Sequence, residues 1–162
     1  MALDQQFLET FIQQEGLNDI FRRNVTDYFN AYAHRLAQIA EASARPIIVG
    51  LNGAQGSGKS TLSQYLSQMM PMQLGVDCHV LSIDDFYLSK VTRKKLAASV
   101  HPLLAIRGVP GTHDIPRLLD ALAGFIEPRV QSVTVPIFDK LKDDCTRRVQ
   151  KIQKSAKPTV IL

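Results

Sequence analysis

Residues 53–60 read Gly-Ala-Gln-Gly-Ser-Gly-Lys-Ser, and they match the pattern G-x-x-x-x-G-K-[ST] at every specified position. An apolar run at 47–51 precedes this stretch, and residues 59–70 follow it with apolar side chains spaced for one face of a helix. A strand, a glycine-rich loop and a helix in this order are the context in which the pattern binds phosphate. The stretch therefore favours a phosphate-binding loop over an ordinary glycine turn.

The residue types in this loop suit a nucleoside triphosphate. Glycines let the backbone curl so that successive N–H groups point at phosphate oxygens, and the N-terminus of a helix that begins near Gly58 adds its partial positive charge. Lys59 would bridge the β- and γ-phosphates, and the Ser60 hydroxyl would ligate Mg²⁺. We therefore expect ATP and Mg²⁺ as cofactors. The candidate nucleotide-binding residues are Gly53, Ala54, Gln55, Gly56, Ser57, Gly58, Lys59, Ser60 and Thr61.

Apolar periodicity along the rest of the chain predicts an α/β fold. Strand-like runs occur at 47–51, 78–83, 132–136 and 158–162, and further helical patterns at about 92–100 and 114–125. Strands that alternate with helices indicate a parallel sheet with flanking helices, here of the P-loop NTPase type. The sheet is expected to be incomplete, because the sequence stops at Leu162 inside a strand and no covering helix follows.

We expect a single domain over residues 1–162. Residues 1–44 form an N-terminal helical segment, in which a first helix at about 4–14 precedes an apolar stripe from Leu17 to Ile39. That stripe is expected to pack against the rest of the domain. The nucleotide-binding core occupies 45–162, with its C-terminal part missing.

Two carboxylates follow the second predicted strand, in the run Asp84-Asp85-Phe86-Tyr87. Ligands of open α/β sheets bind at the carboxyl ends of the strands. A carboxylate at that edge can accept the proton of an attacking hydroxyl, although aspartates also cap loops and helices.

These motifs together resemble a known enzyme group. The loop at 53–60, the run at 84–87, Arg-Gly-Val-Pro-Gly-Thr-His-Asp at 107–114 and Pro-Ile-Phe-Asp at 136–139 are similar to the uridine kinase, phosphoribulokinase and pantothenate kinase group of P-loop kinases. Within it the D-glycerate 3-kinase branch is the nearest match. The resemblance runs from about Pro46 to the C-terminus.

The resemblance implies roles for several residues. Asp84 would be the catalytic base and a second Mg²⁺ ligand beside Ser60, and Lys59 would be the second catalytic residue. Asp85 is expected near the substrate, with either a Mg²⁺-shell or a structural role, and the sequence leaves open which of the two acids is the base.

The same resemblance implies an acceptor pocket. Tyr87, Arg107, His113 and Phe138 would be its substrate-binding residues, with a structural loop role left open for His113. A guanidinium suits a carboxylate bidentately, which agrees with glycerate as the acceptor. The expected activity is transfer of the ATP γ-phosphate to a hydroxyl, most readily that of D-glycerate.

Composition is compatible with a small-molecule enzyme. The 162 residues include 45% hydrophobic and 21% charged residues, with a net charge of +4. Apolar runs are too short to span a membrane, and two cysteines favour reduced thiols in the cytoplasm. The basic stretch at 147–157 is predicted as a solvated helix face rather than a nucleic-acid contact.

Other activities remain open at this point. The acceptor could be pantothenate, uridine or ribulose 5-phosphate. A non-catalytic nucleotide-binding fragment is the second hypothesis, because the arginine-bearing lid and the adenine-side elements of the resembling kinases lie beyond the matched region. A GTPase-like switch is disfavoured, since no N-K-x-D occurs in the chain. The sequence does not indicate the oligomeric state.

Overall fold

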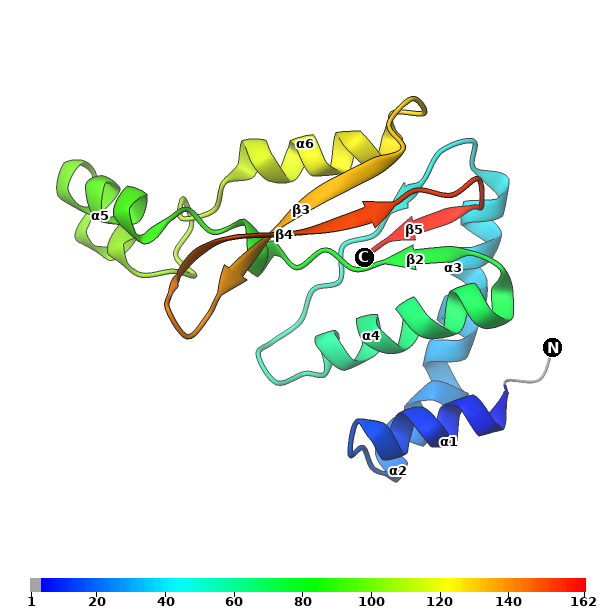
Figure 1. Cartoon of the computed structure of the whole chain (residues 1–162). Coiled ribbons are helices and arrows are strands. Elements are labelled where there is room, and N and C mark those ends of the chain that lie inside the picture. Colours follow the sequence, from blue (N-terminus) through cyan, green and yellow to red (C-terminus); the bar gives the residue numbers. More distant parts are fainter. Residues whose placement is uncertain (1–3) are drawn as a thin grey trace. The chain divides into compact units, whose positions relative to one another are not determined.

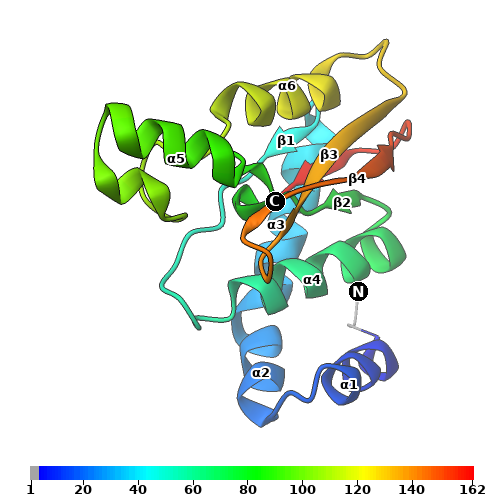
Figure 2. The same cartoon turned by 60° about the vertical axis from the view of Figure 1, so that its left-hand side comes forward.

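The computed structural model describes residues 4–162 and divides them into two compact units (Figures 1 and 2). One unit contains the chain up to Val80 together with Ala156–Leu162, and the other is Leu81–Ser155. Each unit has its own sheet. The expectation of a single domain over 1–162 stays a prediction.

The first unit is a parallel sheet with helices packed against it (Figure 1). Its elements are α1 (Gln5–Gln14), α2 (Asp19–Asn24), the π-helical turn η1 (Val25–Phe29), α3 (Asn30–Ala42), β1 (Ile47–Ile48), α4 (Lys59–Met69), η2 (Met70–Leu74), β2 (Asp77–His79) and β5 (Thr159–Ile161). The strand order is β1-β5-β2, and both pairings are parallel. This confirms the predicted α/β class with flanking helices.

The last strand of the sequence is the central strand of this sheet. Val160 pairs with Ile47 on one side and with Cys78 on the other, and it is completely buried. Its apolar side chains therefore hold β1 beside β2. The phosphate loop leaves the sheet after β1, which makes the position of that loop depend on residues more than a hundred positions later.

The N-terminal apolar stripe packs only in part as predicted. Val25 is fully buried, but Tyr28 is 65% exposed. The reason is the π-helical turn η1, whose wider turn shifts the line of buried side chains by one residue. Phe29 and Ala33 then continue the buried line in place of Tyr28 and Tyr32.

An aromatic cluster joins the N-terminal helices to α4. The Tyr65 ring on α4 meets Phe11 edge to face at 5.4 Å and Phe21 at 5.7 Å between centroids. Tyr65 is fully buried, and its hydroxyl has no hydrogen-bond partner among residues 4–162. Burial raises the pKa of Tyr65 to about 12.

We expect Tyr65→Phe to stabilise the protein, because a buried hydroxyl without a partner costs about 1–3 kcal/mol. In the unfolded chain a tyrosine loses its proton near pH 10, whereas Tyr65 keeps it to about 12. The free energy of unfolding should therefore fall as the pH rises through this window. In Tyr65→Phe that fall should be smaller. Urea unfolding at pH 7 and pH 10.5 measures both effects, and a less stable Tyr65→Phe at pH 7 would contradict the account.

The second unit combines helices with an antiparallel hairpin. Its elements are the 3₁₀ turn η3 (Ile83–Phe86), α5 (Lys90–Ser99), the 3₁₀ turn η4 (Pro102–Ala105), α6 (Ile115–Ile126), β3 (Ser132–Asp139) and β4 (Asp144–Gln153). Helix α6 lies along β3 (Figure 2). Asp114 is the N-cap of α6 and accepts the Arg117 N–H at 3.2 Å, as its position before the helix predicts.

Two predictions for this unit are wrong. The run at 132–136 is not a strand of the parallel sheet, because it belongs to β3, which pairs antiparallel with β4. The basic stretch at 147–157 is not a helix, since most of it lies in β4. Only four residues separate the two strands, and a connection this short permits an antiparallel pair but not a parallel one.

Across residues 4–162 we find no helix that combines the length and the apolar character needed to cross a membrane.

Candidate active site

The phosphate loop has the backbone that its glycines allow. Gly56 and Gly58 have φ values of +76° and +85°, in the left-handed region that favours glycine. Gly58 is the N-cap of α4 and makes no side-chain capping bond. The first N–H groups of α4 are therefore not occupied by a capping side chain and can donate to an anion.

The Lys59 side chain folds back onto the start of the phosphate loop. Its Nζ donates to the carbonyl oxygens of Gly53 at 2.7 Å and Ala54 at 2.8 Å. The ammonium is thereby held above the backbone that would surround a phosphate group. A side chain at Gly53 would bring a Cβ within 2.8 Å of the Ser57 hydroxyl oxygen, so this cradle suits glycine.

These features fit the triphosphate of ATP with its Mg²⁺. The loop offers backbone donors, the Lys59 ammonium and the Ser60 hydroxyl, which is the donor set this chemistry uses. Within residues 4–162 no cluster of three His, Cys, Asp or Glu side chains could hold a metal alone. Mg²⁺ bound mainly through nucleotide phosphates does not need such a cluster.

Asp84 lies in the second unit, in the 3₁₀ turn η3 rather than at the end of a strand. Its carboxylate forms an ion pair with Lys140, with 2.9 Å between Oδ2 and Nζ. The hydrogen bond from Lys140 holds the pKa of Asp84 below its usual range against the opposing effect of burial, and the Lys140 charge and the Tyr87 hydroxyl add to the lowering. Asp84 is therefore an anion at neutral pH and can accept a hydrogen bond from a hydroxyl group.

Asp85 makes a structural contact instead. Its Oδ1 accepts the backbone N–H of Phe138 at 3.1 Å. The register of β3 and β4 shifts between Pro136 and Phe138, so this N–H lies at an irregularity of the ladder. The Asp85 carboxylate provides its acceptor and fastens η3 to β3. This contact favours the structural role over the Mg²⁺-shell role.

We expect Asp85→Ala to lower the free energy of unfolding by about 1–3 kcal/mol, because it leaves a half-buried donor without its partner. Asp120→Ala is the matched control, since Asp120 is an exposed aspartate of α6 in the same unit. Its effect should stay within about 0.5 kcal/mol. Urea unfolding of both variants measures the difference, and equal small losses would remove the fastening role of Asp85.

The ring of Tyr87 packs between the rings of His113 and Phe138. Tyr87 stacks on His113 at 4.2 Å between centroids and meets Phe138 edge to face at 5.2 Å. Burial lowers the pKa of His113, with the Asp84 charge opposing it, so its imidazole is neutral at pH 7. The buried Nε2 of His113 has no hydrogen-bond partner in the described part of the chain.

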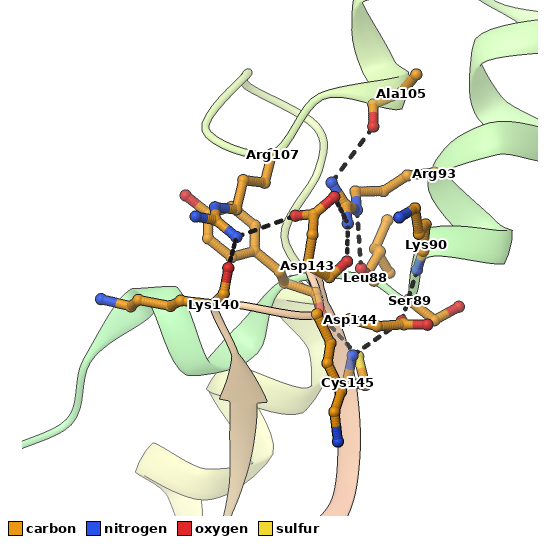
Figure 3. A network of polar contacts seen from close by, with 12 residues as sticks. Leu88, Ser89, Lys90, Arg93, Ala105, Arg107, Lys140, Asp143, Asp144 and Cys145 are labelled. Carbon is orange, nitrogen blue, oxygen red and sulfur yellow. Dashed lines mark hydrogen bonds and ion pairs between the residues drawn. The ribbon is translucent and has the colours of Figure 1, made fainter.

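Arg107 is braced on one side. Its Nη1 donates to the Lys140 carbonyl at 2.8 Å and to the Asp143 carboxylate at 3.1 Å (Figure 3). The guanidinium also lies 5.8 Å from the centroid of the Phe138 ring. All of its hydrogen bonds to residues 4–162 start from Nη1, which leaves Nε and Nη2 able to donate to a ligand.

The structure thus brings together every predicted residue of the acceptor pocket. They come from η3, the loop before α6 and the end of β3, and their contacts form one connected cluster in the second unit. Its members are Asp84, Asp85, Tyr87, Arg107, His113 and Phe138. The predicted nucleotide-binding residues 53–61 belong to the first unit.

Sequence reasoning missed three residues of this cluster. Lys140 pairs with Asp84, and Asp143 accepts from Arg107. Arg93, on α5, is completely buried and bonds to Asp143 as well. Lys140 follows the Phe138-Asp139 pair directly, which is a usable signal, but Arg93 stands among lysines in a polar helix and nothing in its neighbours marks it.

A family model for the KAP family P-loop domain matches residues 29–112, more than half of the 162 residues. The chain belongs to this family. The match spans α3, the phosphate loop and the segment from Asp84 to Thr112. The prediction of a P-loop domain is therefore confirmed, and the match includes residues 53–60.

Proteins similar to this chain include ones described as kinases. A Schizosaccharomyces pombe protein described as an uncharacterized kinase is 38% identical over 100 residues, covering 60% of this chain and 36% of the relative. The structure of D-glycerate 3-kinase from Cryptococcus neoformans var. grubii aligns with a TM-score of 0.71 and 29% identity, over 83% of this chain and 51% of that one.

A structure described as a possible uridine kinase from Bacillus stearothermophilus aligns over 81% of this chain and 70% of its own, with a TM-score of 0.51 and 19% identity, which shows the fold alone. The resemblance to P-loop kinases is thereby confirmed. The chain spans about half the length of the D-glycerate 3-kinase structure and about a third of the Schizosaccharomyces relative.

Proposed function

We propose that the protein is an ATP-dependent phosphotransferase that moves the γ-phosphate of ATP to a hydroxyl group, with D-glycerate as the first candidate acceptor. The observation that carries the proposal is the connected cluster around Asp84, which combines an ionised carboxylate, a neutral histidine and an arginine with unoccupied donors. The likeness to a D-glycerate 3-kinase structure supports the same acceptor.

The phosphate loop would hold the triphosphate through the backbone N–H groups of residues 53–61 and the Lys59 ammonium. The Ser60 hydroxyl would ligate Mg²⁺. When bound, Mg²⁺ neutralises the charge that develops on the phosphate oxygens. Lys59 places a fixed positive charge beside the same oxygens and lowers the free energy of the negative charge that they carry in the transition state.

The acceptor residues would orient the hydroxyl group. The transition state of phosphoryl transfer is loose, so positioning contributes more than strong proton abstraction. Asp84, with its lowered pKa, is suited to this role, because it accepts the hydrogen bond of the hydroxyl and takes its proton as the new P–O bond forms. The Tyr87 hydroxyl, which contributes to the lowered pKa of Asp84, would help to keep this carboxylate in place.

The acceptor carboxylate would bind at Arg107. Nε and Nη2 form one edge of the guanidinium fork, and a fork of this kind pairs with a carboxylate through two hydrogen bonds. His113 would support the pocket through its ring, which stacks on Tyr87. Phe138 lies under the guanidinium and shapes this edge.

We also propose a location in the cytoplasm and small-molecule partners rather than nucleic acid.

A coupled assay of ADP release tests this proposal on the 162-residue chain with Mg-ATP. D-glycerate, pantothenate, uridine and ribulose 5-phosphate are offered in turn at matched concentrations. We expect the highest kcat/KM with D-glycerate. A preference for uridine would overturn the carboxylate contact of Arg107, because uridine has no carboxylate. Binding of ATP without turnover on any acceptor would favour the nucleotide-binding alternative.

A further inference from the structure

Arg93 is a buried charge that the proposed phosphoryl transfer does not use. Its side chain is 0% exposed, and it donates to carbonyl oxygens of three separate segments: Leu88 at 3.2 Å, Ala105 at 3.3 Å and Asp143 at 2.7 Å (Figure 3). An arginine this deeply buried needs a compensating charge. The carboxylate of Asp143 provides it, with 3.1 Å between Nη2 and Oδ2.

The Asp143 carboxylate serves two arginines at once. Oδ2 pairs with Arg93, and Oδ1 pairs with Nη1 of Arg107, each at 3.1 Å (Figure 3). Burial raises the pKa of Asp143, but the hydrogen bond from Arg93 and the charges of both arginines outweigh that effect and leave the pKa below its usual range. The carboxylate is ionised at neutral pH, so two positive charges share one negative charge.

The backbone at Asp143 is held as well. Its φ of +55° lies in the left-handed region, which residues other than glycine seldom adopt. Arg93 donates to the carbonyl oxygen of this same residue. Arg93 therefore fixes both the turn between β3 and β4 and the direction in which its carboxylate points.

This sharing decides which donors of Arg107 are available. A carboxylate with both oxygens free prefers a bidentate pair with a guanidinium. Without Arg93, Asp143 could turn both oxygens to Arg107, neutralise its charge and occupy a second of its nitrogens. With Arg93 in place, Asp143 uses one oxygen on one Arg107 nitrogen only.

We propose that Arg93 is a positioning residue for the acceptor. By pairing with one oxygen of Asp143, Arg93 leaves the positive charge of Arg107 only partly compensated. It also leaves one edge of the Arg107 guanidinium open to the carboxylate of a hydroxy acid. This inference rests on the proposed function for its ligand, a small hydroxy acid. It adds a specificity role for a residue that does not touch that ligand.

The first variant is Arg93→Met, which keeps an apolar stem of similar length and removes the charge. We expect the dissociation constant for D-glycerate, measured by calorimetry, to rise about ten- to a hundredfold, as for loss of a charge-assisted contact. The dissociation constant for Mg-ATP should change less than about threefold, since additivity errors alone are of about this size. Glycerol, which lacks the carboxylate, serves as the comparison ligand and should show no Arg93-dependent difference.

The rescue variant is Arg93→Met combined with Asp143→Asn. Asparagine still accepts from Arg107 Nη1 but cannot neutralise it, so D-glycerate binding should return to within about threefold of the wild-type value. A merely structural Arg93 predicts the reverse, because the double variant loses one more contact of the turn. Residue 143 keeps its contact with Arg107 in both variants, and urea unfolding of each variant before the titrations checks that it is folded.

The outcomes separate the two proposals. Wild-type protein that binds D-glycerate without turnover removes the proposed phosphotransferase activity, while the two variants still decide the role of Arg93. Binding that stays weak in the double variant, or that is unchanged in Arg93→Met, overturns the role of Arg93 and leaves the proposed function intact. Wild-type protein that does not bind D-glycerate overturns both.

Discussion

Asp84→Asn should reduce kcat by about 10²- to 10⁴-fold, the usual contribution of general acid–base catalysis. The amide keeps the size of the carboxylate and much of its hydrogen bonding, but it cannot take the proton of the acceptor hydroxyl. The ion pair with Lys140 is lost too, but both groups are partly exposed, so its contribution to stability is small. Steady-state kinetics with Mg-ATP and D-glycerate measures the loss, and nucleotide binding by calorimetry should be nearly unchanged.

Asp85→Asn is the matched control for this experiment. Its carboxylate accepts from the Phe138 backbone N–H, and an asparagine oxygen can accept the same bond. We expect kcat to fall less than about tenfold, well below the general-base range. A larger kcat defect in Asp85→Asn than in Asp84→Asn would mean that the two acids have been assigned in the wrong order.

Lys59→Ala should weaken the binding of Mg-ATP by at least about ten- to a hundredfold. The substitution removes the ammonium that would contact the β- and γ-phosphates and also the two bonds that Lys59 makes to the loop carbonyls of Gly53 and Ala54. A charge-assisted contact to phosphate is worth about 1.5–3 kcal/mol, or about ten- to a hundredfold in affinity, and disorder in the loop adds to this. Calorimetry with Mg-ATP measures the result.

Arg23→Ala is the control for the Lys59 variant, because it removes an exposed positive charge from the same unit. Its affinity for Mg-ATP should match that of the wild-type protein, and both variants should unfold at the wild-type urea concentration, since surface substitutions usually change stability by less than about 0.5 kcal/mol. Undiminished nucleotide affinity in Lys59→Ala would contradict the assignment of the phosphate loop.

The parts of the fold that follow from local signals could be predicted. The loop at 53–60, the helix after it and the Asp114 cap depend on residues next to one another in the chain, and all three occur as expected. Strand pairing is not local. The periodicity of 132–136 predicts a strand but not the strand with which it pairs. The sequence did not predict β4 as a strand, because the basic residues at 147–157 alternate with few apolar ones.

The prediction that the N-terminal apolar stripe buries Tyr28 was wrong for a related reason. A regular helix would carry Tyr28 to the buried side, but the π-helical turn adds a residue to one turn and carries Phe29 there instead. Apolar side chains stand at both positions, so the sequence does not distinguish the two registers. In the observed register Val25 and Phe29 pack into the hydrophobic cluster that also contains residues of α1, α3 and α4.

The residues of the candidate site also fall into those that a sequence motif predicts and those that only the fold reveals. Motifs with fixed spacing predict roles for Lys59, Asp84 and the acceptor residues, and the structure places Lys59 in the first unit and the others in the second. The residues that hold them are not part of any motif. Arg93 and Asp143 lie fifty positions apart, and only the fold shows that one carboxylate is shared by two arginines.

Phosphoryl transfer to D-glycerate can be followed directly by phosphorus NMR, with the 162-residue chain, Mg-ATP and D-glycerate in one tube. We expect a phosphomonoester signal to grow in step with that of ADP, and to be absent when Lys59→Ala replaces the wild-type protein. ATP that stays intact, or that is hydrolysed to inorganic phosphate with no phosphomonoester at any glycerate concentration, would contradict the proposed kinase activity.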